Sequence, residues 1–169
     1  MQSSILLNSP LRLCGEACVF ERFSDEVRDV IGYANLAATS RGHQFMGPEH
    51  VLLGMLKEGK CPAAGVLNEV GAELESMEQE MDRLVRREVA GDVSVKLPMT
   101  PQMKKVIERS IEVAMRLRHN SVGTEHLLFA LLENPDGVQV HMLTRRRHDV
   151  EAIRSRTLEL LARYEDRAK

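Results

Sequence analysis

Apolar residues recur with helical spacing in two stretches of this chain. Between residues 24 and 39, and again between 100 and 117, they fall three or four positions apart, which places them on one face of an α-helix. Ser24 and Thr100 open these stretches, and each side chain can cap a helix by accepting a hydrogen bond from an unpaired backbone N–H group. The pattern predicts two helices whose core-facing residues are Val27, Val30, Ile31, Ala34 and Ala38, and Met103, Val106, Ile107, Ile111, Ala114 and Leu117.

Each of these helices is followed by three more segments of helical character. A short segment at 48–56 or 124–132 is apolar nearly all round, so we expect it to lie buried between its neighbours. A third helix is predicted at about 62–70 and 137–145. The fourth carries the apolar residues Leu74, Met77, Met81, Leu84 and Val85 in the first half, and Val150, Ile153, Leu160 and Leu161 in the second. The sequence therefore predicts an all-α fold of eight helices in two halves.

The two halves repeat one another in sequence. The segment HQFMGPEHVLLGML at 43–56 returns as HNSVGTEHLLFALL at 119–132, a shift of 76 residues (119 minus 43), and the register holds on both sides without a gap. Between the copies, residues 88–99 lose helical periodicity and contain glycine and proline, which is typical of a linker. We predict one domain over 20–163, which contains repeat one at about 20–87, the linker at 88–99 and repeat two at about 100–163. A leader at 1–19 precedes this domain and a tail at 164–169 follows it.

Composition supports a helical domain and argues against several partners. Hydrophobic residues make up 43% of the chain but aromatic residues only 4%, so the residues that favour strands are few. The formal charge of -2 gives no overall field that would attract nucleic acid or anionic lipid, and no stretch approaches the roughly 20 apolar residues of a membrane helix. An odd count of three cysteines and the absence of a secretory signal pattern lead us to expect a cytoplasmic location.

Three motifs carry a resemblance to a known family. They are FERFS at 20–24, the twice-used H-x3-G-[TP]-E-H-[VL]-L-[LF]-[GA]-[ML]-L, and LPMTPQMKKVIE at 97–108. Together they resemble the N-terminal domain of ClpC-type members of the Clp (Hsp100) unfoldases, over roughly residues 19–163. The resemblance implies an eight-helix domain of two pseudo-symmetric four-helix Clp N repeats. Such a domain receives substrates and adaptor proteins and passes them to an ATP-driven ring, which feeds the Clp peptidase.

The resemblance implies a role without catalysis or cofactors. Because no ATPase module follows before Lys169, we expect a free-standing accessory of a Clp protease system. It would bind adaptor proteins or marked protein substrates, and either deliver them to the Clp unfoldase or compete with it. The alternative is a structural accessory subunit that docks on the Clp peptidase or the unfoldase and regulates their assembly. No nucleophile and base pattern and no metal-ligand pattern in the sequence favours an enzyme.

The resemblance also implies two ligand sites. In ClpC-type relatives, a hydroxyl and a glutamate position form each of two pockets for phosphorylated arginine on proteins marked for degradation, and the matching residues here are Ser24 with Glu49 and Thr100 with Glu125. A helix N-terminus offers N–H groups to a phosphoryl group, and a carboxylate can bind a guanidinium group. The same residue types would also occur if they only capped helices. Pro48 stands where the second copy has threonine, so the first site is the less complete.

Two further patterns have simpler explanations than the functions they suggest. The segment at 54–60 fits the G-x4-G-K of a phosphate-binding loop, but Cys61 follows where serine or threonine is required, so we predict a helix-ending turn. Four histidines recur without the spacing of a zinc motif, and we predict that they are hydrogen-bonded, partly buried and fix a turn: His43, His50, His119 and His126.

Two groups of residues are candidates for docking a partner. Phe20 and Phe23 open the first repeat. In the second repeat, Arg145, Arg146 and Arg147 replace the small-residue turn of the first, so we expect the third helix to end differently and leave them exposed. The simpler interpretation is a solvated basic turn. The sharper one is a docking patch for an acidic partner, with binding that weakens as salt increases.

Overall fold

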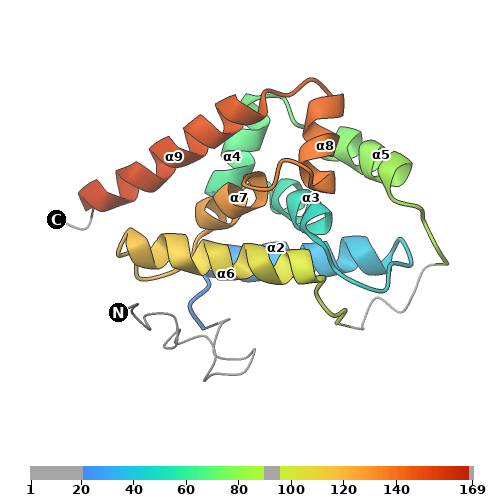
Figure 1. Cartoon of the computed structure of the whole chain (residues 1–169), viewed down its shortest axis with the longest axis horizontal. Helices are drawn as coiled ribbons and strands as arrows, with labels where there is room; N and C mark the ends of the chain where they lie inside the picture. The colour runs from blue at the N-terminus through green and yellow to red at the C-terminus, as the bar shows by residue number, and fades with distance from the viewer. Residues whose placement is uncertain (1–20, 90–95, 168–169) are drawn as a thin grey trace, which may run out of the picture.

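Eight α-helices form the part of the chain that the structure describes. The computed structural model describes residues 21–89 and 96–167, with side chains to residue 163. Within these ranges the predicted all-α fold of two four-helix repeats is confirmed (Figure 1). The helices are α2 (Asp25–Thr39), α3 (Pro48–Glu58), α4 (Pro62–Glu69) and α5 (Leu74–Leu84) in repeat one, and α6 (Pro101–Arg116), α7 (Thr124–Leu132), α8 (Val138–Arg145) and α9 (Val150–Arg167) in repeat two.

The predicted leader at 1–19 and the centre of the predicted linker lie outside the described residues. The linker residues on either side of this gap are described, and helix α9 continues past residue 163, where the sequence analysis begins the tail.

The helix starts follow from local chemistry. The Ser24 hydroxyl accepts a hydrogen bond from the Val27 N–H group at 3.4 Å, and the Thr100 hydroxyl accepts one from Met103 at 3.1 Å. These bonds satisfy N–H groups that have no partner inside the helix, so both predicted caps are confirmed. Three helices begin with a proline, which is tolerated at the first helical position because that N–H group needs no intrahelical acceptor: Pro48, Pro62 and Pro101.

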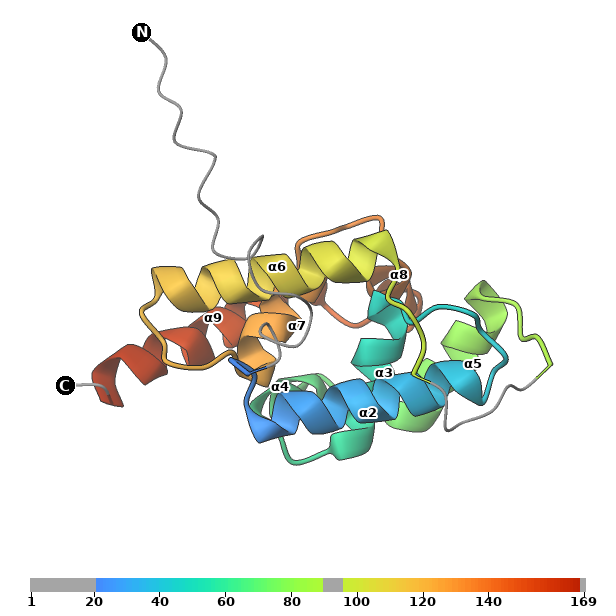
Figure 2. The same ribbon diagram turned by 90° about the horizontal axis from the view of Figure 1, so that it is seen from below.

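The two repeats interlock. Helices α2 and α6 run in opposite directions on either side of α3 and α7 (Figure 2), whereas α5 and α9 lie at opposite ends of the molecule (Figure 1). The fourth helix of each repeat packs against the third helix of the other, α5 on α8 and α9 on α4. Two short parallel bridges, Phe23 with Val122 and Met46 with Met99, join the segments that precede the helices. The result is one hydrophobic core that runs through both repeats.

The predicted helix stripes form this core with three exceptions. Leu117 and Val85 are only half-buried and lie outside the core, and Leu84, the last residue of α5, is exposed. One close contact makes repeat one tighter than repeat two, because a Cβ atom at Gly54 would collide with the backbone carbonyl oxygen of Val30. Helix α3 therefore lies directly on the backbone of α2. The equivalent position in repeat two is Ala130, whose methyl group rules out such an approach between α7 and α6.

Candidate functional site

The N-terminus of α2 lies beside a loop of the opposite repeat. The Ser24 N–H group donates to the Val122 carbonyl oxygen at 3.0 Å, and the Val122 N–H group donates to the Arg22 carbonyl oxygen at 2.8 Å. Val122 belongs to the loop between α6 and α7, directly before the helix that carries Glu125. The cap of repeat one therefore lies near the glutamate of repeat two.

The equivalent arrangement occurs with the repeats exchanged, where the N-terminus of α6 lies beside the loop before α3. The Thr100 N–H group donates to the Met46 carbonyl oxygen at 3.0 Å, and the Met46 N–H group donates to Pro98 at 2.9 Å. Met46 lies in the loop before α3, the helix that carries Glu49. Thr100 of repeat two is therefore placed beside the Glu49 loop of repeat one.

This crossing corrects the grouping made from the sequence. Grouping Ser24 with Glu49, and Thr100 with Glu125, is wrong, because it assumes that each site is built within one repeat. The backbone bridges combine Ser24 with the Glu125 loop and Thr100 with the Glu49 loop. Each candidate site is therefore shared between the repeats.

A pair of histidines fixes the loop at each site. The Gly123 N–H group donates to His126 Nδ1 at 3.0 Å, and His126 Nε2 lies 2.7 Å from His119 Nδ1. Because His126 Nδ1 accepts, Nε2 carries the proton and donates to His119. Repeat one has the same bonds between Gly47, His50 and His43. The predicted structural role of the histidines is confirmed, and no group of three potential ligands in the described ranges is arranged to hold a metal ion.

The two glutamates fold back over the start of their own helices. A Cβ atom at Gly123 would collide with the Glu125 carboxylate, so a glycine is required there for the carboxylate to lie over the helix N-terminus. Gly47 leaves the same space for Glu49. The Glu125 side chain is only 4% exposed and that of Glu49 is 14% exposed. Burial raises the pKa of the Glu49 carboxyl, against a smaller opposing effect of its own backbone N–H group.

The side chain nearest to the buried Glu125 carboxylate does not donate a hydrogen bond to it. Among the described residues, the side-chain atom within ion-pair distance of it is His126 Nδ1, at 3.2 Å. That nitrogen already accepts the Gly123 N–H group, so in the neutral ring it has no hydrogen to donate. Burying the charge of a carboxylate is unfavourable, and a cationic ligand would offset this cost.

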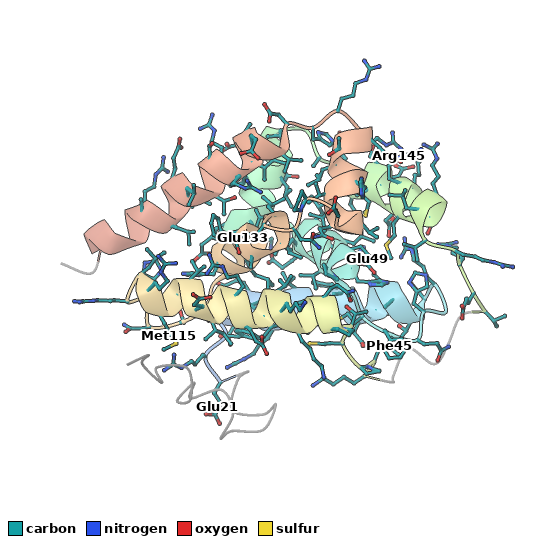
Figure 3. The ribbon with its side chains drawn as sticks, viewed as in Figure 1. Glu21, Phe45, Glu49, Met115, Glu133 and Arg145 are labelled. Carbon is teal, nitrogen blue, oxygen red and sulfur yellow. The ribbon has the colours of Figure 1, made fainter. Side chains whose placement is uncertain are left out.

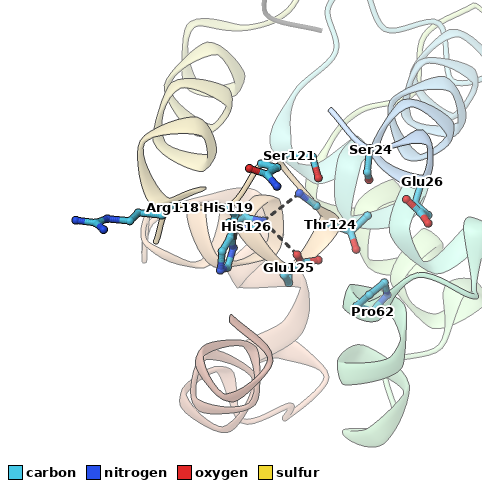
Figure 4. Close-up of a pocket in the computed structure, with 11 residues that line it drawn as sticks. Ser24, Glu26, Pro62, Arg118, His119, Ser121, Thr124, Glu125 and His126 are labelled. Carbon is cyan, nitrogen blue, oxygen red and sulfur yellow. Dashed lines mark hydrogen bonds and ion pairs between the residues drawn. The ribbon is translucent and has the colours of Figure 1, made fainter. Parts of the chain in front are cut away.

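A pocket of about 470 Å³ opens beside this carboxylate (Figure 4). Its walls come from the N-termini of α2, α4 and α7 and from the loop between α6 and α7. The Thr124 hydroxyl joins two of these walls, because it accepts a hydrogen bond from the Ala63 N–H group at 3.3 Å. The charged residues of the lining are Glu26, Glu125 and Arg118, together with the cap Ser24. We call this space the Ser24–Glu125 pocket.

Sequence reasoning missed two of these lining residues, Glu26 and Arg118. Both differ from their equivalents 76 residues away, Gln102 and Gly42, and this difference between the repeats was the available signal. Arg118 adopts a positive φ of 57°, an unusual conformation for a residue with a side chain. Gly42 has a φ of 77° at the matching place. The turn is therefore conserved between the repeats, although only one of them uses the residue suited to it.

Two of the three arginines proposed for docking pair with a buried carboxylate. Arg146 Nε lies 3.0 Å and Arg145 Nε 3.3 Å from the carboxylate of Glu80, whose side chain is 3% exposed, and Arg145 lies where α8 meets α5 (Figure 3). Arg83 also pairs with this carboxylate, at 2.6 Å. Helix α8 ends at the residue equivalent to the end of α4, so the expectation of a different ending is wrong. Arg145 and Arg147 are exposed, as expected, and Arg147 has a φ of 61°.

The other candidates are also placed by the structure. Phe23 is 3% exposed and packs in the core between the repeats, a position that does not offer its ring to a partner. Phe20 lies outside the described residues. Gly54 lies within α3, and Gly59 ends that helix at a φ of 76°, so the predicted helix-ending turn is confirmed. None of the helices in residues 21–89 and 96–167 is both long and apolar enough to cross a membrane.

The fold and the crossed sites define a class of duplicated helical domain whose two halves share their sites. Comparison with known proteins gives the family. The model of the Clp repeat (R) N-terminal domain matches residues 22–112 and 98–169. The chain therefore belongs to the family of Clp N-terminal domains, and the resemblance noted from the sequence is confirmed.

Similar proteins support this assignment. The chloroplastic chaperone protein ClpC2 of Arabidopsis thaliana is 36% identical over 148 residues, which cover 88% of this chain and 15% of ClpC2. The N-terminal domain of ClpD from Arabidopsis thaliana has a TM-score of 0.73 at 20% identity and covers 88% of this chain and 99% of its own. A ClpV N-domain in complex with a VipB peptide has a TM-score of 0.65 at 14% identity and covers 88% and 92%. The chain spans 15 to 17% of the length of the curated relatives it matches.

Proposed function

We propose that the chain is a non-catalytic recognition module of a Clp ATP-dependent protease system. It binds segments of protein substrates or adaptor proteins, including proteins marked with phosphoarginine, and works without a cofactor. It either delivers them to a ClpC-type unfoldase or competes with that unfoldase for them. Membership of the Clp N-terminal domain family supports this proposal, as does the peptide complex of a ClpV N-domain with the same fold.

The observation that carries the proposal is the buried Glu125 carboxylate at the wall of a pocket. A carboxylate used only for a helix N-terminus is usually solvated, where its interaction with the helix dipole contributes about 0.3–1 kcal/mol. The Glu125 side chain is only 4% exposed, and burying a charged carboxylate costs more than this gain. A guanidinium group supplies paired N–H donors and a positive charge, so arginine is the side chain that this site fits best.

The proposal predicts that the two glutamates are required for binding. In the double variant Glu49→Gln/Glu125→Gln, affinity for a peptide with one arginine or one phosphoarginine should fall at least about tenfold, because a hydrogen bond to a charged group contributes about 1.5–3 kcal/mol. Fluorescence anisotropy with labelled peptides measures this directly. Asp29→Asn, which removes an exposed carboxylate from α2 outside the pocket lining, is the control and should leave affinity unchanged. Unchanged binding by the double variant would remove these sites from the proposal.

Capture of partners distinguishes this function from the structural alternative. Immobilised domain should recover adaptor proteins or marked substrates from a lysate, and the double variant should lose them. Recovery of the peptidase or unfoldase core alone, equally by both proteins, would support a structural accessory subunit instead.

A further inference from the structure

The two pseudo-equivalent sites differ in charge at two positions, Glu26 against Gln102 and Arg118 against Gly42. Glu26 is the second residue of α2 and lines the Ser24–Glu125 pocket. The equivalent residue, 76 positions later, is Gln102, the second residue of α6 beside the Glu49 loop. Both side chains are exposed at helix starts, so neither is required for the core. The substitution therefore changes the charge of one site while it leaves the fold alone.

Glu26 also engages the hydroxyl group that a phosphoryl ligand would use. The pKa of the Glu26 carboxyl lies below its ordinary value because it accepts hydrogen bonds from its own backbone N–H group and from the Ser24 hydroxyl. The Ser24 hydroxyl itself accepts the Val27 N–H group at 3.4 Å. In the other site, Thr100 accepts from Met103, and its neighbour Gln102 carries no charge.

The remaining charges of the pocket do not offset these two carboxylates. Figure 4 shows the Glu125 carboxylate pointing toward the side of the pocket where Thr124 and Pro62 lie, whereas the Arg118 side chain extends away from it. Glu26 and Glu125 therefore face the pocket without a cation between them. A phosphoryl group, which carries about -1.5 to -2 charges at neutral pH, would be repelled by Glu26 at the start of α2.

We propose that the Ser24–Glu125 pocket binds an unmodified arginine side chain of a peptide, and that Glu26 excludes phosphoarginine from it. Glu125 binds the guanidinium group from the buried side and Glu26 adds a second, exposed carboxylate. The Thr100–Glu49 site, with Gln102 in place of Glu26, admits the phosphorylated form. This inference rests on the proposed function, since both sites act in peptide recognition, and it assigns a different arginine chemistry to each.

The test isolates each pocket with one substitution. In the Glu49→Gln background only the Ser24–Glu125 pocket keeps its glutamate, and an arginine peptide should bind about tenfold more tightly than the same peptide with phosphoarginine, since one like-charge contact is worth about 1 kcal/mol or more. Adding Glu26→Gln should weaken the arginine peptide and strengthen the phosphoarginine peptide, which brings the ratio near one. Isothermal titration with the two synthetic peptides gives both affinities.

The reciprocal exchange tests the other site. In the Glu125→Gln background, Gln102→Glu should reduce phosphoarginine affinity about tenfold by placing one like charge there, while arginine binding is maintained or improved. The control matched to Glu26→Gln is Glu75→Gln, which removes the same charge at the second residue of α5, another exposed first-turn position. This control should leave both affinities unchanged.

The outcomes separate this inference from the proposed function. A peptide preference that is unchanged by Glu26→Gln and Gln102→Glu overturns the inference, even when both peptides bind and recognition stands. Binding of neither peptide to the unaltered domain overturns both. The inference is supported when Glu26→Gln brings the ratio of affinities near one and Gln102→Glu reduces phosphoarginine affinity about tenfold, without a change in melting temperature.

Discussion

At the scale of single residues, His50 is the clearest case of a side chain whose charge is fixed by the fold. The Gly47 N–H group donates to Nδ1, and Nε2 lies 2.7 Å from His43 Nδ1. His43 Nε2 in turn lies 3.2 Å from the Arg86 carbonyl oxygen. This chain of bonds is complete when both rings are neutral. Burial, followed by the charges of His43 and Arg41, lowers the pKa of His50 to about 3.

Because the fold keeps His50 neutral, we expect the protein to lose stability in mild acid. In the unfolded chain its pKa is 6.5, so between pH 6.5 and about 3 the unfolded state binds a proton that the folded state does not. The free energy of unfolding should therefore fall by about 1 kcal/mol per pH unit below 6.5. Urea midpoints measured from pH 7.5 to 4.5 test this, and His50→Gln should flatten the curve.

The Glu49 carboxyl changes the free energy of unfolding with pH in the opposite direction to His50. Its raised pKa means that the folded state binds this proton more tightly, so its contribution is full below the unfolded value of 4.5 and is lost as pH rises through the folded value. Glu49→Gln should therefore leave the acid-side decline steeper. A midpoint that stays constant over this range in the unaltered protein would contradict the assignment of His50 as a neutral side chain.

At the scale of helices, the contact of α5 with α8 and that of α9 with α4 each contain an ion pair at equivalent positions. The acidic residue of one pair occupies the position of the basic residue in the other. Glu80 on α5 pairs with Arg145 on α8 at 3.3 Å, and at the equivalent positions Arg156 on α9 lies 3.9 Å from Glu69 on α4. The two pairs differ in burial, because the side chain of Glu80 is 3% exposed and that of Glu69 is 60% exposed. Two arginines besides Arg145 also converge on Glu80, Arg83 and Arg146.

This difference in burial predicts unequal contributions to stability. Glu80→Gln should lower the free energy of unfolding by about 2 kcal/mol, because it removes a buried charged acceptor on which three arginine side chains converge. Glu69→Gln makes the same chemical change at the equivalent contact and should cost less than about 0.5 kcal/mol, as is usual for exposed pairs. Chemical denaturation followed by circular dichroism measures both. Equal losses would show that burial of the Glu80 carboxylate does not determine its contribution.

At the scale of the whole molecule, the sequence predicted the elements better than their arrangement. Helical periodicity, caps and the repeat were enough to give eight helices close to their observed bounds. The crossing was not predictable, because a repeated sequence is equally compatible with four-helix halves that pack separately and with halves that exchange contacts. The pairing of Ser24 with the Glu125 loop depends on backbone bridges between residues about a hundred positions apart, for which local patterns give no signal.

The interlocking predicts that neither repeat folds alone. Residues 21–89 and 96–167, prepared separately, should show reduced helical circular dichroism and no cooperative unfolding, because α5 and α4 each lose a packing partner in the other repeat. Mixing the two fragments should restore part of the signal. A repeat that unfolds cooperatively on its own, as stably as the intact chain, would show that the contacts between the repeats are dispensable.

The contacts between the repeats also set how far apart the two candidate sites lie. Because each site combines residues of both repeats, the separation between them is built into the core and does not depend on a linker. A flexible segment with two suitably spaced arginines would gain avidity, since the first contact raises the effective concentration of the second. The domain would then respond to the spacing of charges along a polypeptide as well as to their presence.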